Sequence, residues 1–129
     1  MKTITHYLLA LLITACLSCK NNNQDLLIGK WNWEKYSYES PVGAAKTYQT
    51  NQAGSYITFA NNGSFEQKQD GLLFNANWKH SVGSTTEFII ENYSNKYIIT
   101  QLDKHTLIFY SDIKDVNNNT IRYYSYLNR

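Results

Sequence analysis

The stretch SYITFANNGSFEQK, residues 55–68, decides the fold class of this chain. Two runs with aromatic and β-branched residues, 55–60 and 64–68, flank the triplet Asn61-Asn62-Gly63. Residues of these types favour strands, and Asn-Gly supplies the positive φ angle that a tight hairpin turn needs. The stretch therefore predicts a β-hairpin.

The same pattern of short runs and turn signals continues on both sides of this hairpin. No segment has a sustained period of 3.6 residues, whereas alternation places Leu72, Phe74, Ala76 and Trp78 on one face of a strand. Such spacing is typical of a meander, a barrel or a sandwich. The further predicted strands are Gly29–Tyr38, Leu72–Lys79, Thr85–Asn92, Lys96–Leu102, Thr106–Ser111 and Ile121–Leu127.

Eight short antiparallel strands joined by tight turns close most economically into a barrel, because closure removes exposed sheet edges. We therefore predict an all-β chain, a small eight-stranded antiparallel up-and-down β-barrel. The long polar connection Glu39–Asn51 is expected to be a loop or a short helical turn, placed to gate the barrel mouth.

Residues 1–19 have the features of a secretory signal. Lys2 gives a positive start, and the apolar run Tyr7–Leu17 is too short for a bilayer core of ~30 Å, which needs about 20 residues. Ile13-Thr14-Ala15-Cys16 resembles the lipobox of bacterial lipoproteins, in which the cysteine is acylated and becomes the new N-terminus. Cys16 is the predicted lipidation site, and Cys19, which directly precedes a polar stretch, is the alternative.

The predicted organisation has three parts: a lipoprotein signal peptide with its lipidation site at 1–19, a polar tether at 20–27 and a β-barrel domain at 28–129. Cys16 and Cys19 are the only cysteines, so a disulfide within the barrel is excluded. A redox Cys-x-x-Cys motif needs a βαβ context, and a zinc site needs further ligands. We expect a membrane-anchored protein of a Gram-negative cell envelope, on the outer membrane.

The charge balance and the spacing of reactive residues argue against several functions. Twelve Lys+Arg against ten Asp+Glu give no basic footprint for nucleic acid. His80 and His105 are expected to be solvated turn residues, because no nucleophile or carboxylate lies at a recognisable spacing from either. Glu87 and Glu91 do not identify an acid pair. Asp112–Asn119 lacks the pattern of a calcium loop and is expected to be a wide turn. We predict no catalytic residue, no metal and no cofactor, and hence no enzyme.

Gly29-Lys30-Trp31, at the start of the first predicted strand, is similar to the Gly-x-Trp signature of lipocalins. The strand–turn–strand Tyr56–Glu66, Trp78 and the late pairing Tyr97–Asp112 resemble small bacterial lipocalin-like domains. The resemblance implies that Trp31 closes one end of the barrel and that a basic residue of the last strand packs over its ring. Arg122 is the only arginine of the last predicted run and is the partner that the resemblance implies.

The aromatic residues are the main indication of a binding site. Eight strands leave an interior that is either filled by side chains or just able to hold one small ligand. Both outcomes stay open, since each aromatic residue buries roughly 150–250 Å² and could fill that space. If a pocket exists, Trp33, Trp78, Phe88 and Phe109 are the predicted ligand-binding residues.

Two functions follow from these alternatives. The first is an envelope lipoprotein whose lipocalin-like domain binds a small hydrophobic or amphipathic ligand. The second is a structural or interaction lipoprotein with a solid barrel, which binds another envelope protein through a tyrosine-rich face. Arg122, Tyr124 and Tyr126 lie on one face of the last strand, opposite Tyr123 and Leu127, and tyrosine and arginine are favoured at protein interfaces.

Overall fold

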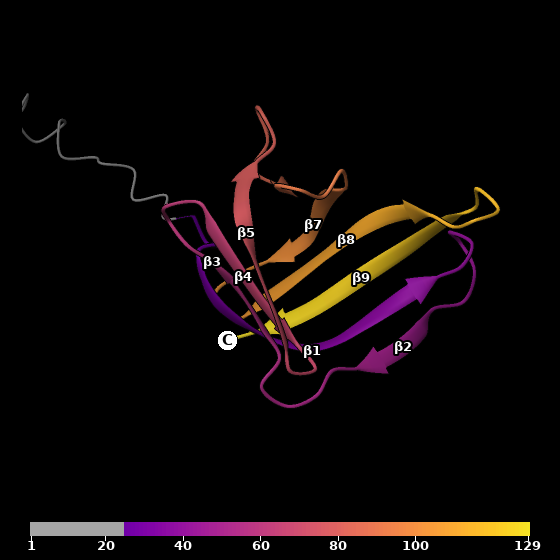
Figure 1. The fold of residues 1–129 in the computed structure, drawn as a ribbon, viewed down its shortest axis with the longest axis horizontal. Coiled ribbons are helices and arrows are strands. Elements are labelled where there is room, and N and C mark those ends of the chain that lie inside the picture. Colours follow the sequence, from indigo (N-terminus) through magenta and orange to yellow (C-terminus); the bar gives the residue numbers. More distant parts are fainter. Residues whose placement is uncertain (1–24) are drawn as a thin grey trace, which may run out of the picture.

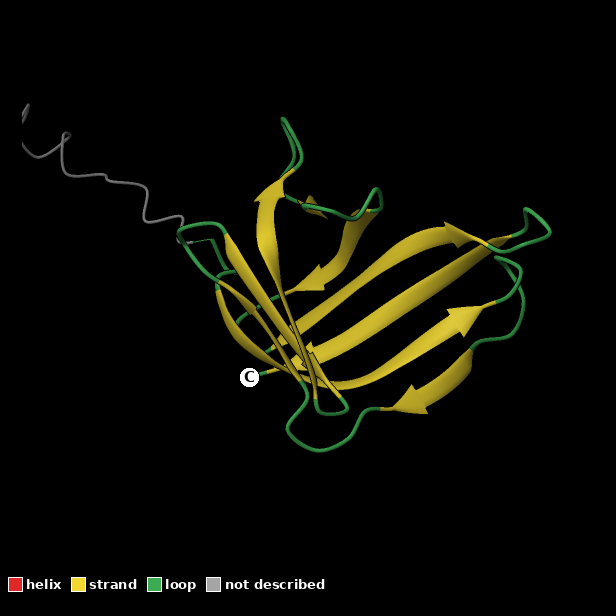
Figure 2. Cartoon of the chain, in the orientation of Figure 1, coloured by secondary structure: helices red, strands yellow, loops and turns green. Residues whose placement is uncertain are grey.

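The computed structural model describes residues 25–129, and every regular element among them is a β-strand (Figure 2). Cys16, Cys19 and the predicted signal lie outside the described residues. No helix in the described part of the chain is long and apolar enough to cross a membrane. The strands are β1 (Gly29–Glu39), β2 (Thr47–Thr50), β3 (Tyr56–Phe59), β4 (Ser64–Gln69), β5 (Leu72–His80), β6 (Glu87–Ile90), β7 (Lys96–Leu102), β8 (Thr106–Lys114) and β9 (Thr120–Asn128).

The strands form one antiparallel sheet in the order β2-β1-β3-β4-β5-β6-β7-β8-β9, and β9 also pairs with β1. This last pairing closes β1 and β3–β9 into an eight-stranded up-and-down barrel, which confirms the predicted fold class. β8, β9 and β1 run side by side as long ribbons, with β2 along the outer edge of β1 (Figure 1). We call the end with Gly29, Arg129 and the turns at 60–63, 81–86 and 103–105 the closed end. The end with the turns at 70–71, 91–95 and 115–119 is the open end.

β1 is long enough to pair with different neighbours along its length. Its first part pairs with β3 through Gly29–Asn32, and its later part pairs with β2 through Lys35–Tyr38. The prediction of a loop or helical turn between Glu39 and Asn51 is therefore wrong for Thr47–Thr50. This strand extends the sheet instead of covering the mouth. Its four side chains are all exposed, so its sequence has no buried face and shows no apolar alternation that could have identified it.

The hairpin between β3 and β4 forms as predicted. Phe59 pairs with Phe65, and the N–H of Gly63 donates to the carbonyl of Ala60 at 3.0 Å. Gly63 has a φ of 85°, in the left-handed region that glycine adopts without a steric penalty. Asn62 contributes through its side chain, because its Oδ1 accepts a hydrogen bond from the N–H of Ser64 at 3.0 Å.

The closed half of the barrel is filled by an aromatic cluster centred on Phe59. The Phe59 ring packs edge-on against Phe65, Trp78 and Phe88, with ring centroids 5.2–5.4 Å apart. Leu27 belongs to the same core and is fully buried. The predicted tether at 20–27 therefore extends too far, because packing of the domain begins before residue 28.

Leu72 departs from the expected inward face of β5. Its side chain is 79% exposed, whereas Trp78 on the same face is only 7% exposed. Leu72 begins β5 at the open end, directly after the turn at 70–71.

Trp31 closes the opposite end of the barrel, but its cationic partner is Arg129. The Trp31 ring is fully buried, and its Nε1 donates to the Leu27 carbonyl at 2.9 Å. The Arg129 guanidinium lies 3.9 Å from the ring centroid and donates to the carbonyls of Leu26, Ile28 and Lys104 at 2.9–3.0 Å.

The prediction that Arg122 packs over Trp31 is wrong. β9 runs antiparallel to β1, so Arg122, near the start of β9, pairs with Glu39 at the far end of β1. Asn128, next to Arg129, reaches Asn32 at the beginning of β1. Arg122 instead forms a bidentate ion pair with Asp112 and lies 4.1 Å from the Tyr110 ring centroid.

Candidate ligand-binding cavity

A cavity of about 300 Å³ occupies the half of the barrel toward the open end. Its size is at the lower end of the range of small-molecule sites, ~300–1,000 Å³. Of the two alternatives for the barrel interior, filled by side chains or able to hold one small ligand, this hollow favours the second. The lining residues are aromatic, aliphatic or neutral polar, and none is an acid, a lysine or an arginine: Trp33, Tyr36, Ile57, Phe65, Gln67, Gln69, Ile90, Tyr93, Tyr97, Phe109, Ser111, Tyr123 and Ser125.

A β-bulge in β1 determines which side chains of this strand line the cavity. The register between β1 and β9 shifts between Trp33 and Lys35, so Glu34 is an extra residue. Because side chains alternate across a strand, the extra residue reverses the phase. Trp33 faces inward before the bulge and Tyr36 faces inward after it.

Asn51 holds the bulge in place. Its backbone N–H donates to the Glu34 carbonyl at 2.9 Å, and its Nδ2 donates to the Trp33 carbonyl at 3.2 Å. Its Oδ1 accepts a hydrogen bond from Nε2 of Gln69, at 3.0 Å. Asn51 is 7% exposed, so this network satisfies a buried amide while fixing the wall beside Trp33.

Trp33, which lines the cavity, carries a buried hydrogen-bond donor without a partner among residues 25–129. Its side chain is 9% exposed, and its Nε1 is buried with no hydrogen-bond partner among residues 25–129. An indole N–H can only donate. A buried donor left unpaired costs about 1–3 kcal/mol of desolvation.

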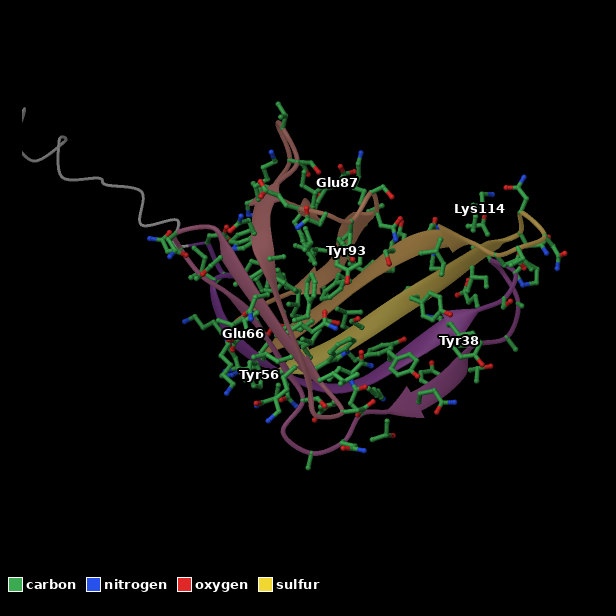
Figure 3. All side chains as sticks on the ribbon, viewed as in Figure 1. Tyr38, Tyr56, Glu66, Glu87, Tyr93 and Lys114 are labelled. Atoms are coloured by element: carbon green, nitrogen blue, oxygen red, sulfur yellow. The ribbon has the colours of Figure 1, made fainter. Side chains whose placement is uncertain are left out.

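Tyr97 gives the cavity a hydroxyl that stays protonated. Burial, followed by the neighbouring Tyr93, raises the pKa of Tyr97 to about 12. The Tyr97 ring stacks on Phe88 at 5.0 Å, which fixes its orientation. Tyr93, labelled in Figure 3, comes from the turn after β6. Its ring centroid lies 5.3 Å from that of Phe74.

Solved structures share this architecture. Bovine odorant-binding protein, crystallised with its natural ligand, superposes with a TM-score of 0.50 at 15% identity, over 84% of this chain and 74% of that one. The fold is lipocalin-like. Lobster apocrustacyanin A1 superposes with a TM-score of 0.49 at 17% identity, over 85% of this chain, which spans 64% of its length. No protein-family model and no curated protein sequence matches the chain.

The lipocalin-like cavity includes two of the four predicted ligand-binding residues. Trp33 and Phe109 line it, whereas Trp78 and Phe88 lie in the packed core below. Trp78 donates its Nε1 to the Ala60 carbonyl at 3.0 Å, and Phe88 is fully buried between Phe59 and Phe109. All four face inward, but alternation does not show how far along the barrel each one lies.

Tyrosines of the open half were missed as site residues. Tyr123 could have been found, because it alternates with Tyr124 and shares the inward face of Leu127. Tyr36 could not have been found from alternation, because the bulge reverses its direction. Residues 39–51, expected to gate the mouth, contribute nothing to the lining.

The predicted tyrosine-rich face lies on the outside of β8, β9 and β2. We call Tyr110, Tyr124, Tyr126 and Tyr48 the tyrosine ladder, since adjacent ring centroids are 5.5, 6.5 and 6.2 Å apart. Lys46 lies 3.8 Å from the Tyr124 centroid, and the Tyr126 hydroxyl is 2.9 Å from the hydroxyl of buried Ser37. The ladder is a partly exposed surface, and three cations lie over its rings: Lys35, Lys46 and Arg122.

His80 sits at the closed end in a second, more open hollow of about 520 Å³. Its Nε2 is 2.6 Å from Asp25 Oδ2, and its Nδ1 is 3.3 Å from the Glu87 carbonyl. His80 was predicted to be solvated and without a carboxylate partner, and this is wrong. Both ring nitrogens therefore lie within hydrogen-bond distance of protein oxygens. The pair fastens the segment before β1 to the end of β5.

His105 is exposed in its turn, as predicted. Within residues 25–129 no group of three or more acidic, histidine or cysteine side chains could hold a metal ion.

Proposed function

We propose that this protein binds a small hydrophobic or amphipathic molecule inside its lipocalin-like barrel. The observation that carries the proposal is the cavity of about 300 Å³ with an uncharged, mainly aromatic wall. Such concave, apolar sites with a few polar groups are typical of ligand pockets. The proposed role is binding without catalysis, and it is supported by a cavity wall that contains no carboxylate, histidine, lysine or arginine.

Binding is tested with the neutral fluorescent probe N-phenyl-1-naphthylamine. We expect its fluorescence to rise on binding to the full chain, and Ser111→Phe to abolish the rise by filling the cavity. Ser111 is 9% exposed and lines the hollow. Asn75→Phe, on the exposed side of β5, is the matched control. Equal enhancement by both variants would contradict binding inside the barrel.

We also propose that the barrel is anchored to the membrane of a Gram-negative envelope, on the outer membrane, through lipid on Cys16. The lipobox-like Ile13-Thr14-Ala15-Cys16 supports this, with Cys19 as the alternative. Two or three acyl chains, each contributing ~0.8 kcal/mol per buried CH₂, make attachment effectively permanent. Cys16→Ala should abolish labelling by radioactive palmitate and release the protein from the membrane fraction. If only Cys19→Ala loses the palmitate label, Cys19 is the lipidation site. If the wild-type protein is not labelled either, the protein is not lipidated.

A second candidate function uses the tyrosine ladder as a surface for another envelope protein. Its ordered rings and Lys46 have the composition favoured at protein interfaces. A crosslinked partner should disappear with the double variant Tyr124→Ser/Tyr126→Ser. Ligand binding in the cavity should survive, because both side chains point away from it. Retention of the same partner would contradict this role.

A further inference from the structure

The cavity wall contains no charge, although charged residues occur in the same strands. Gln67 and Gln69 line the cavity, and alternation puts Lys68 on the outer face between them. Lys35 lies 5.3 Å from the ring centroid of Tyr126 on the outer surface, and Arg122 is held by Asp112. A charged ligand group would thus be buried without a counter-ion, which is strongly unfavourable.

The shape and the chemistry of the wall favour a compact ring system. Indole, phenyl and phenol rings account for more than half of the lining residues. Aromatic groups gain from edge-to-face and offset contacts with such rings. The volume of about 300 Å³ equals that of about ten water molecules in the liquid. One or two fused rings fit within this volume.

Hydrogen-bond donors of the wall favour a ligand that carries a hydrogen-bond acceptor. The buried Nε1 of Trp33 has no acceptor among residues 25–129. A ligand oxygen that reaches the Trp33 ring and displaces the atoms that now cover Nε1 would supply the acceptor that residues 25–129 do not. The Tyr97 hydroxyl, which remains protonated, adds a second donor in the same wall.

We propose that the cavity selects an uncharged aromatic molecule of one or two rings that carries an accepting oxygen, and that it rejects the corresponding carboxylate. This inference rests on the proposed function, that the barrel interior binds a small molecule. The wall supplies ring contacts and donors, and it supplies no cation.

Three probes of nearly identical shape test the selection by calorimetry with the full chain. 2-Acetylnaphthalene is neutral with an accepting oxygen, 2-isopropenylnaphthalene replaces that oxygen with CH₂, and 2-naphthoate carries a negative charge. We expect the ketone to bind about threefold to tenfold more tightly than the alkene, the gain of one net hydrogen bond. We expect the carboxylate to bind at least about tenfold more weakly than the ketone.

Two variants test whether these binding preferences arise from residues of the cavity wall. Trp33→Phe should remove the preference for the ketone over the alkene, and the Trp33 indole N–H resonance, identified by its loss in this variant, should move only with the ketone. Gln67→Lys should reverse the order and favour 2-naphthoate, because it places a cation inside. Asn75→Lys, the exposed cross-strand neighbour of Glu66, puts the same charge outside and should change nothing.

The outcomes separate the two proposals. If no probe binds, or if binding persists unchanged in Ser111→Phe, the proposed function fails. If the probes bind in the cavity but 2-naphthoate or the alkene equals the ketone in the wild-type protein, ligand binding stands and the selection proposed here is overturned. The wild-type comparison decides this even if a variant fails to fold.

Discussion

Replacing Gly29 by alanine should destabilise the barrel in a way that depends on Arg129. Gly29 has a φ of 128°, and a Cβ added there would lie 2.7 Å from Nη1 of Arg129. The positive φ alone costs a residue with a side chain about 1.5 kcal/mol. The new methyl group would also push the guanidinium off the Trp31 ring and away from the Ile28 and Leu26 carbonyls.

The contribution of Arg129 follows from its contacts. Its guanidinium makes three hydrogen bonds to carbonyls and one cation–π contact, but the residue is exposed, so each is weakened by solvent. Arg129→Ala should therefore lower the free energy of unfolding by about 2 kcal/mol. Gly29→Ala should cost about 3 kcal/mol, the sum of the backbone strain and the loss of part of the arginine contacts.

The double variant carries the decisive result. Once Arg129 is absent, Gly29→Ala should cost only its backbone strain, so the pair should lose about 3.5 kcal/mol instead of about 5. Urea unfolding followed by tryptophan fluorescence measures each value. Arg122→Ala is the control, because the Arg122 guanidinium also lies over an aromatic ring, and pairs with Asp112, but does not approach Gly29. The losses in unfolding free energy for Gly29→Ala and Arg122→Ala should add within about 0.5 kcal/mol in their double variant. If the losses for Gly29→Ala and Arg129→Ala add equally well, the close approach of Arg129 does not explain why position 29 is a glycine.

Three further predictions concern single sites. Gly63→Ala should lower stability by about 1–2 kcal/mol through its φ of 85° alone, since the added Cβ would have ordinary contact, 3.5 Å, with the Trp78 carbonyl; an unchanged urea midpoint would contradict this. Burial raises the pKa of Tyr97 to about 12. The protonated hydroxyl therefore contributes its full stability below the pKa of about 10 in the unfolded chain, and this contribution is lost as the pH rises toward 12. Tyr97→Phe should flatten the alkaline fall in the urea midpoint. The hydrogen bond from Arg122 lowers the pKa of Asp112. Ionised Asp112 therefore stabilises the folded state above the ordinary carboxyl pKa, and this contribution is lost as the pH falls through the lowered pKa. It amounts to about 0.5 kcal/mol or less, because the site is exposed. Arg122→Gln should therefore change the acid limb of the stability profile only slightly, and a large change would refute the assignment.

The strands that bury one face were predictable because their information is local. Alternation and the Asn-Gly signal placed the β3–β4 hairpin correctly, and residues 29–38 and 96–102 were predicted within one residue of β1 and β7. β2 was not predicted, because all four of its side chains are exposed. Its pairing depends on β1 continuing past the bulge, which no local pattern in 47–50 reveals.

The candidate site was only half predictable. Sequence alternation shows which side chains point inward, so Trp33 and Phe109 were found. It does not separate the packed half from the hollow half, so Trp78 and Phe88 were assigned to the site although they belong to the core. Tyr36 was hidden by the bulge, whose position is fixed by Asn51 from another part of the chain.

The sequence by itself determined the all-β class and the hairpin turns, and its resemblance to lipocalins implied that Trp31 closes one end. The class and the turns depend on the preferences of single residues and on a period of two, both of which act over a few positions. Only the tertiary structure decided that Arg129 and not Arg122 covers Trp31, and where the core ends and the cavity begins. Those outcomes depend on the register in which the last strand meets the first, and that register is fixed by the closure of all eight strands together.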